Sequence, residues 1–322
     1  MERVISAPDI ESIYDVPLNF EKDHLGETLL ESLGLMAKKS DKSFQSWKKM
    51  ARGIKNHHDN EVNIAIVGKY FNTGDFILSD AYISVLEAVK FSAYANGVKA
   101  VLHTVNSRDF EVDNPDYSVL DKFQGIIVPG GFGESGIEGK LNVIRHAREN
   151  NIPYFGLCYG MQLMTIEYAR NVLSLDGAQT AEIDPKAPHL IIDIMPDQKN
   201  KLAEGNYGGS MRLGLYPAKL LKGSVACKAY ENALKVKNVS NIDERHRHRY
   251  EVNPNYIEKL EKGGLVFSGK SPDGTLMEIA ELPVNVHPFF LGTQFHPEFL
   301  ARPLAPHPLF TAFIKAAKKR IL

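Results

Sequence analysis

The sequence predicts an α/β fold in which helices cover both faces of a mostly parallel sheet. Strand and helix patterns alternate four times between Val62 and Cys158, which is typical of such a sheet. Short apolar runs at Asn63–Val67, Val98–Val105 and Phe123–Val128 have the length and composition of buried strands. With 322 residues, 43% of them apolar, the chain is long enough to bury the core that this fold needs.

Local signals place the helices between these strands. Asp80 can cap a helix that runs to about Asn96, and a second helix near residues 138–150 leads into the strand that ends at Cys158. In parallel α/β sheets, ligands bind beyond the carboxyl ends of the strands. Cys158 therefore stands where a functional residue is expected.

Antiparallel strands and a final helix are predicted after the parallel core. Residues 265–279 form a hairpin pattern around a Pro-Asp-Gly turn, and the apolar run Phe289–Phe295 is a late strand. Apolar residues recur at helical spacing from Leu309 to Ala317. The fold class is therefore α/β: a doubly wound, mostly parallel sheet flanked by helices, with added antiparallel strands.

Composition narrows the class of protein. The net charge of −1 argues against wholesale nucleic-acid binding. The 2 cysteines are too few for a disulfide scaffold, and the first residues lack the pattern of a signal peptide. No apolar run approaches the ~20 residues of a membrane span. We therefore expect a cytoplasmic protein that binds neither nucleic acid nor membrane.

The first 61 residues differ from the rest. Residues 1–35 hold short proline-containing pieces that look extended, including Ser12–Pro17, and one helical stripe ended by Gly34. Residues 36–61 are polar and basic, and they are predicted to be a linker with a short amphipathic helix. Such a helix suits a membrane surface or a neighbouring domain, and we favour the domain. The main domain is predicted to span residues 62–322.

The turn after the fourth strand carries the clearest chemical signal, Gly156–Gln162 (GLCYGMQ). Glycines two residues before and after Cys158 let the backbone take a cramped conformation, as at the nucleophile elbows of hydrolases. The helix that follows points its free N–H groups and positive dipole end at the sulfur, which favours a reactive thiolate. On this heptapeptide alone, a small packed cysteine beside a tight turn is the alternative.

Another strand end carries hydrogen-bond donors. Pro129–Gly133 (PGGFG) follows a buried strand directly, and its adjacent glycines can turn their N–H groups toward one point. If the N–H groups of Gly131 and Tyr159 point to the same place, they form an oxyanion hole beside Cys158.

A base and a carboxylate follow the late strand. His296 and Glu298 flank Pro297, and extended geometry would send both side chains to the same side. Cys158, His296 and Glu298 would then act as nucleophile, base and orienting group. Viewed alone, His296 is a surface histidine at a proline turn.

Three of these motifs resemble those of the class I (triad) glutamine amidotransferases, in the family's order. They are PGGFG at Pro129–Gly133, GLCYGMQ at Gly156–Gln162 and QFHPE at Gln294–Glu298. The resemblance implies the family's doubly wound, flavodoxin-like fold and a glutamine-hydrolysing enzyme.

Three longer stretches are similar to the glutaminase half of the CTP synthase family and to the tail of its synthetase half. They are Ile5–Pro17 (ISAPDIESIYDVP), Gly208–Gly214 (GGSMRLG) and Glu244–Asn253 (ERHRHRYEVN). Without the resemblance, the last would be a solvated basic strand or an RNA-binding patch. The similarity assigns residues 1–35 to the tail of a synthetase (amidoligase) domain and residues 62–322 to the amidotransferase domain.

The resemblance also implies residue roles. Cys158 would attack the side-chain amide of L-glutamine, His296 would transfer protons and Glu298 would hold His296. The backbone N–H groups of Gly131 and Tyr159 would form the oxyanion hole. The substrate-binding set would be Gly131, Phe132, Tyr159, Gly160, Met161, Gln162, Glu182 and Arg249. Tyr159 stands where the family is expected to have leucine, which should alter the pocket's shape but not the chemistry.

The nucleotide-binding synthetase half of that family is not in this sequence. The chain alone is therefore expected to hydrolyse L-glutamine to glutamate and ammonia, and not to aminate UTP. No metal and no cofactor are expected for the hydrolysis. ATP and Mg²⁺ are implied only for the synthetase half, with GTP as an activator, and a homo-oligomer only for the full-length protein.

Two other functions stay open. One is a cysteine hydrolase of the same fold that cuts γ-glutamyl bonds, although it would have no reason to carry residues 1–17. The other is a non-catalytic docking or filament-forming module with a relic triad, which the missing half keeps open.

Overall fold

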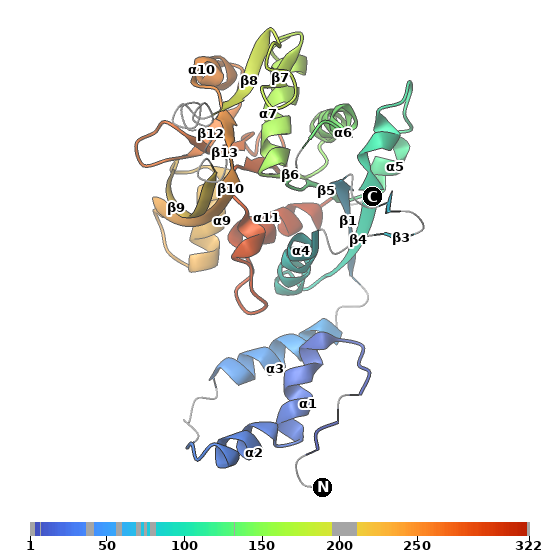
Figure 1. Ribbon diagram of the computed structural model, residues 1–322, viewed down its shortest axis with the longest axis vertical. Coiled ribbons are helices and arrows are strands. Elements are labelled where there is room, and N and C mark those ends of the chain that lie inside the picture. Colours follow the sequence, from blue (N-terminus) through green and yellow to red (C-terminus); the bar gives the residue numbers. More distant parts are fainter. Residues whose placement is uncertain are drawn as a thin grey trace. The chain divides into compact units, whose positions relative to one another are not determined.

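The computed structural model describes residues 4–6, 8–36, 42–55, 60–68, 72–73, 76–77, 82–131, 133–194 and 211–320 (Figure 1). The chain divides into two compact units, Met1–Asn60 and Glu61–Leu322. Within the described ranges, no helix is both long enough and apolar enough to cross a lipid bilayer.

The amino-terminal unit is helical. Its elements are the 3-10 turn η1 (Ile13–Asp15) and the helices α1 (Val16–Lys22), α2 (Leu25–Ser32) and α3 (Lys42–Lys55). The indole N–H of Trp47 in α3 donates to the carbonyl of Tyr14 over 2.8 Å. The amphipathic helix predicted in the linker is present, and it packs on the segment that begins this unit. The assignment of residues 1–35 to a synthetase domain stays a prediction.

The expected extended conformation of Ser12–Pro17 is wrong. Ser12 caps η1 by accepting the N–H of Tyr14, and Pro17 lies in the first turn of α1. A helix accepts proline there because the first N–H groups have no intrahelical partner and the fixed φ of proline is already helical. Proline in the first helical turn and proline in an extended segment give the same local signal, so the sequence pattern did not separate them.

Among the described residues of the second unit, one sheet has nine strands in the order β10-β9-β12-β13-β14-β6-β5-β1-β4. Their bounds are β1 (Glu61–Gly68), β4 (Lys99–Asn106), β5 (Gly125–Val128), β6 (Tyr154–Leu157), β9 (Arg212–Leu220), β10 (Asn241–His248), β12 (Val266–Lys270), β13 (Met277–Glu281) and β14 (Phe290–Thr293). From β14 to β4 neighbouring strands pair in parallel, and from β10 to β14 they pair antiparallel. This arrangement confirms the predicted fold class.

Helices cover both faces of this sheet (Figure 1). One face packs on α6 (Ile137–Glu149) and α7 (Tyr159–Asn171), with α5 (Ser118–Asp121) and α10 (Pro254–Lys262) contributing to the same apolar core. The other face packs on α4 (Ile83–Ala95), α9 (Val225–Leu234) and α11 (Pro308–Ala317). The 3-10 turns η3 (Ser107–Phe110) and η5 (Pro297–Phe299) follow β4 and β14.

Two smaller sheets belong to the described part of this unit. A sheet of order β11-β8-β7 contains β7 (Ala178–Thr180), β8 (His189–Ile194) and β11 (Tyr250–Val252), and β2 (Asn72–Thr73) pairs with β3 (Phe76–Ile77). Asp80, the expected cap of α4, lies outside the described residues. The N-cap position of α4 is occupied by Tyr82.

Candidate active site

Cys158 stands between β6 and α7 in a strained backbone conformation. Its φ of 49° and ψ of −98° lie outside the regions that residues with side chains normally adopt, at a cost of roughly 1–3 kcal/mol. Its N–H donates to the carbonyl of Thr293 in the neighbouring strand β14 over 2.6 Å. The sharp strand-to-helix turn expected from the sequence is therefore present, and it holds a buried thiol at the carboxyl end of β6.

Two glycines allow close packing around this turn, Gly160 within it and Gly130 in the loop after β5. A Cβ added to Gly160 would lie 2.1 Å from the carbonyl oxygen of Val128, closer than any real contact allows. A Cβ added to Gly130 would lie 2.9 Å from Cε1 of His296 and 3.7 Å from Cβ of Cys158. The glycine-rich loop after β5 therefore lies directly against both reactive side chains.

His296 and Glu298 are paired as expected. Nδ1 of His296 lies 2.7 Å from Oε1 of Glu298, and the imidazole stacks on the ring of Phe299 at a centroid distance of 5.0 Å. We had expected an extended backbone between them, but the structure has the 3-10 turn η5 there. Proline at the start of a 3-10 turn returns the chain on itself, so His296 and Glu298 meet across the turn rather than along a strand.

The electrostatics of His296 tie it to Cys158. Burial disfavours the protonated ring, yet the pKa of His296 lies well above its ordinary value because the charges of Cys158 and Glu298, and hydrogen bonds to both, favour the imidazolium. A thiolate beside an imidazolium is the reactive form of cysteine hydrolases. The three side chains that the sequence placed at separate strand ends therefore form one interacting group.

A pocket of about 370 Å³ opens beside the sulfur of Cys158. Its lining, among the described residues, is Gly131, Cys158, Tyr159, Gln162, Glu182, Met211, Arg247, His248, Arg249 and Tyr250. The pocket thus brings together one acid, two arginines and the thiol, a combination that suits a small zwitterionic ligand.

Most of the expected substrate-binding residues meet at this pocket. Gly131, Tyr159, Gln162, Glu182 and Arg249 line it. Gly160 and Met161 are instead buried in the first turn of α7 and do not line the pocket. Phe132 lies outside the described residues.

Gln162 and Gln294 are hydrogen-bonded to each other beside Cys158. The side-chain amide of Gln162 donates to the carbonyl of Tyr250 over 3.0 Å and to the side-chain oxygen of Gln294 over 3.1 Å. The amide of Gln294 in turn lies 3.7 Å from the sulfur of Cys158. The sequence motif contained Gln294 but gave it no role, and the structure places its amide against the thiol.

Tyr159 fills the space between the acid of the pocket and a buried lysine. Burial raises the pKa of its phenol, and the charge of Glu182 raises it further. Nζ of Lys140, a residue only 1% exposed, lies 5.5 Å from the centre of the Tyr159 ring and 3.9 Å from where a Cβ of Gly131 would stand. A buried cation therefore sits behind the two residues whose N–H groups were predicted to form the oxyanion hole.

The Arg/His stretch forms a half-buried strand and not the solvated surface that its composition suggests. Side chains of β10 alternate between exposed and buried, and His246 and His248 point inward, with Nδ1 of His246 3.0 Å from Nε2 of His248. Arg212 lies 2.6 Å from Glu278 and 3.6 Å from Glu251 in the same cluster. We call these five residues the buried polar cluster.

The buried polar cluster lies directly behind the reactive side chains. The carbonyl of Arg245 in β10 accepts the N–H of His296 over 2.8 Å, and the carbonyl of Arg247 lies 3.9 Å from the sulfur of Cys158. Strict alternation in Asn241–His248 is a strand signal that could have identified the inward histidines. Their acidic partners are distant in sequence and gave no such signal.

The fold and the site together define an α/β protein with a thiol, an imidazole and a carboxylate at the carboxyl ends of its parallel strands. The model of the family described as glutamine amidotransferase class-I matches residues 77–316. The chain belongs to this family.

Individual relatives are CTP synthases. The CTP synthase of Staphylococcus carnosus is 46% identical over 318 residues, which cover 99% of this chain and 55% of that protein. The CTP synthase of Pyrococcus abyssi is 46% identical over 319 residues, with the same coverage of 99% and 55%. The chain spans about half the length of the curated relatives it matches.

A solved structure shows the same fold. The glutaminase domain of Trypanosoma brucei CTPS, with bound acivicin, superposes with a TM-score of 0.72 at 37% sequence identity, covering 81% of this chain and 95% of that chain. The resemblance drawn from the short motifs is therefore confirmed over nearly the whole sequence.

Proposed function

We propose that this chain is the glutaminase part of a CTP synthase and hydrolyses L-glutamine to glutamate and ammonia. The observation that carries the proposal is the site itself: Cys158 in a strained elbow, paired with His296 and Glu298, opens on a 370 Å³ pocket that contains Glu182 and Arg249. The pocket matches the charges of glutamine, because the carboxylate of Glu182 suits its ammonium group and the guanidinium of Arg249 suits its carboxylate.

The first half of the reaction forms a thioester. The sulfur of Cys158 attacks the side-chain carbonyl carbon of glutamine, while the N–H groups of Gly131 and Tyr159 hold the oxyanion that develops. The C–N bond then breaks, the nitrogen takes the proton of the His296 imidazolium, and ammonia leaves. Each oxyanion donor in comparable sites contributes about 10²–10³ in rate.

The second half restores the enzyme. His296, now neutral, removes a proton from water, which attacks the thioester carbon and displaces the sulfur. The thiolate and the imidazolium are regenerated as glutamate leaves. Glu298 keeps one ring nitrogen of His296 occupied through its 2.7 Å contact, so the other faces Cys158 and the substrate.

We further propose that the ammonia is used by a synthetase domain that aminates UTP with ATP and Mg²⁺ in pyrimidine nucleotide synthesis. The similarity to CTP synthases of which this chain covers 55% supports this proposal. The helical unit Met1–Asn60 exposes Leu33, Leu35 and Met36, which suits contact with further protein. ATP and Mg²⁺ would bind the synthetase domain, so no step of glutamine hydrolysis passes through them.

Ammonia release from glutamine tests the proposal. We expect the chain to release ammonia from L-glutamine, and more rapidly when a synthetase domain is supplied with ATP and UTP. Release from γ-glutamyl peptides but not from glutamine would identify a γ-glutamyl hydrolase instead. If neither class of substrate releases ammonia when the synthetase domain is present, the chain is a non-catalytic module.

Replacing Tyr159 with leucine is expected to leave kcat within about threefold of the wild type, since the oxyanion donor is the backbone N–H. KM should change, because the phenol lies beside Glu182 and the ring covers the pocket wall. Steady-state kinetics with glutamine separates the two constants. A fall in kcat of a hundredfold or more would show that the ring itself takes part in the chemistry.

Replacing Arg249 with methionine is expected to raise KM for glutamine about 10- to 100-fold, because a hydrogen bond to a charged group contributes roughly 1.5–3 kcal/mol. The matched change Arg247→Met removes the other arginine that lines the pocket and should have the smaller effect. Equal effects of the two changes would contradict the assignment of Arg249 to the substrate carboxylate.

A further inference from the structure

A second, larger pocket lies at the amino ends of strands β6 and β14, whereas Cys158 lies beyond the carboxyl end of β6. Its volume is about 950 Å³, and it is lined by residues before β6 and β14, by α9 and by α11. Pro153 and Phe289 stand at the amino ends of these two strands, whereas Cys158 and His296 follow their carboxyl ends. The four residues of β6 separate the two sites by roughly 13 Å, so this pocket is not part of the active site.

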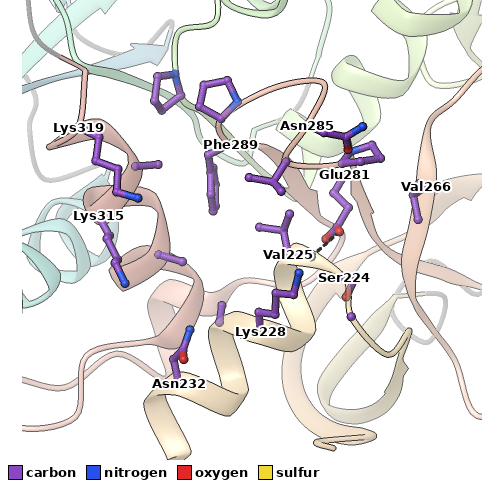
Figure 2. A pocket seen from close by; sticks show the side chains of 18 of the residues that line it. Ser224, Val225, Lys228, Asn232, Val266, Glu281, Asn285, Phe289, Lys315 and Lys319 are labelled. Carbon is purple, nitrogen blue, oxygen red and sulfur yellow. Dashed lines mark hydrogen bonds between the residues drawn. The ribbon is translucent and has the colours of Figure 1, made fainter.

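The floor of this pocket is apolar. The ring of Phe289 lies at its centre, between α11 and α9 (Figure 2). Three prolines, Pro153, Pro283 and Pro288, and the small side chain of Ala316 complete the floor. Branched side chains, Leu221, Val225, Val266 and Val284, also line the pocket. The faces of the aromatic and proline rings are surfaces on which a planar ring can pack.

The rim of the pocket is strongly basic. Its cationic residues are Lys222, Lys228, Lys315, Lys319 and Arg320. Figure 2 shows Lys315 and Lys319 on one wall and Lys228 on α9. Five cations in one pocket depart from a chain in which 38 basic residues are balanced by 39 acidic ones.

Glu281, the acid that lines this pocket, already has hydrogen-bond partners in the protein. Glu281 is 2% exposed and accepts the N–H groups of Val225 and Ala226 and the hydroxyl of Ser268. Its carboxylate caps the amino end of α9 and also attracts the charge of Lys228. Nε of Arg320 is also covered, and it has no hydrogen-bond partner among the described residues.

We propose that this pocket binds a small aromatic anion: a planar ring packs on Phe289 and the prolines, and a phosphate or sulfonate group contacts Lys228, Lys315 and Lys319. The volume is within the range of small-molecule sites, about 300–1,000 Å³, and such sites combine an apolar lining with a few convergent polar groups. The distance between the two sites lets this ligand bind with glutamine present.

The test uses the full chain and the fluorescent aromatic anion 1-anilinonaphthalene-8-sulfonate as probe. We expect saturable binding at one site, weakened at least tenfold by Lys315→Glu with Lys319→Glu and at least tenfold by Ala316→Trp, which fills the floor. The matched control is Lys259→Glu with Lys262→Glu, two exposed lysines of α10, and it should stay within twofold of the wild type. Thermal unfolding shows that each variant folds.

Competition then identifies the ligand class. Naphthyl phosphate should displace the probe, whereas inorganic phosphate and laurate at the same concentration should not. Displacement by laurate as effective as by naphthyl phosphate would overturn the proposal in favour of an acyl site. Probe binding that neither the glutamate pair nor Ala316→Trp alters would show that the pocket does not bind aromatic anions.

Discussion

Replacing Cys158 with alanine is expected to abolish glutamine hydrolysis while the protein stays folded. Loss of a catalytic nucleophile costs on the order of 10⁴- to 10⁶-fold in kcat, because no thioester can form and only direct attack by water remains. Alanine removes only the sulfur, and the strained φ of 49° is borne by the backbone in both proteins. Ammonia release measures the activity, and denaturant unfolding should agree with the wild type within about 1–2 kcal/mol.

Cys227→Ala is the matched control, because Cys227 is the other cysteine of the chain and is fully buried in α9. It should retain activity, since its sulfur lies in the apolar core and has its polar contact with the carbonyl of Val239, over 3.5 Å, away from the active site. The glutamine analogue diazo-oxo-norleucine should label Cys158 and not Cys227, as mass spectrometry would show. Hydrolysis that survives Cys158→Ala, or a label on Cys227, would contradict the assignment of the nucleophile.

The reactive residues and the glycine-rich loop could be located from the sequence because each of these motifs follows an apolar strand. The runs before Pro129, Cys158 and His296 are buried strands of one parallel set, and the carboxyl ends of parallel strands lie at one edge of a sheet. The strand ends therefore marked Cys158 and His296 as candidates, and the resemblance of their motifs to those of the amidotransferases identified them as partners.

The rest of the site was not predictable by the same route. The alternating pattern of β10 indicates a strand, but its inward face carries His246 and His248, so the pattern does not show which face is buried. Its burial depends on Arg212, Glu251 and Glu278, which come from three other strand regions. Single-sequence patterns report local periodicity, and the pairing of distant polar groups leaves no trace in them.

Replacing Arg212 with methionine is expected to destabilise the fold by about 3–5 kcal/mol at pH 8, because it removes the cation from a buried group of carboxylates. Nη1 of Arg212 lies 2.6 Å from Oε1 of Glu278, whose side chain is fully buried, and the arginine side chain itself is 9% exposed. Methionine keeps most of the volume and the apolar stem, so the loss is electrostatic. Urea unfolding of variant and wild type at several pH values measures it.

The destabilisation caused by Arg212→Met should grow as the pH rises. Burial raises the pKa of Glu278 to about 7, although Arg212 opposes the shift, and burial and the charge of Glu278 also raise the pKa of Glu251. A carboxyl with a raised folded-state pKa contributes stability that is present below its ordinary value of 4.5 and lost as the pH rises through about 7. Without Arg212 both pKa values rise further, so the variant loses more stability than the wild type between about pH 5 and 8.

The two histidines of the buried polar cluster also make the difference in stability between variant and wild type smaller at low pH. Burial, with Arg212 second, lowers the pKa of His246 to about 2 and that of His248 to about 3. A histidine with a lowered folded-state pKa contributes stability that is present above its ordinary value of 6.5 and lost as the pH falls. Removing Arg212 lifts both values, so acidification costs the variant less than the wild type, and the two unfolding free energies should converge toward pH 5.

A second substitution separates charge from packing. Adding Glu278→Gln to Arg212→Met removes one carboxylate together with its cation and should recover at least half of the lost stability at pH 8, because an uncompensated buried charge costs more than an absent pair. Arg212→Lys, which keeps the charge, should be the mildest of the three variants. A destabilisation by Arg212→Met that is equal at pH 5 and pH 8, and that Glu278→Gln does not relieve, would mean that Arg212 stabilises the protein through its packing on Tyr216, at 4.6 Å from the ring centre, and not through its charge.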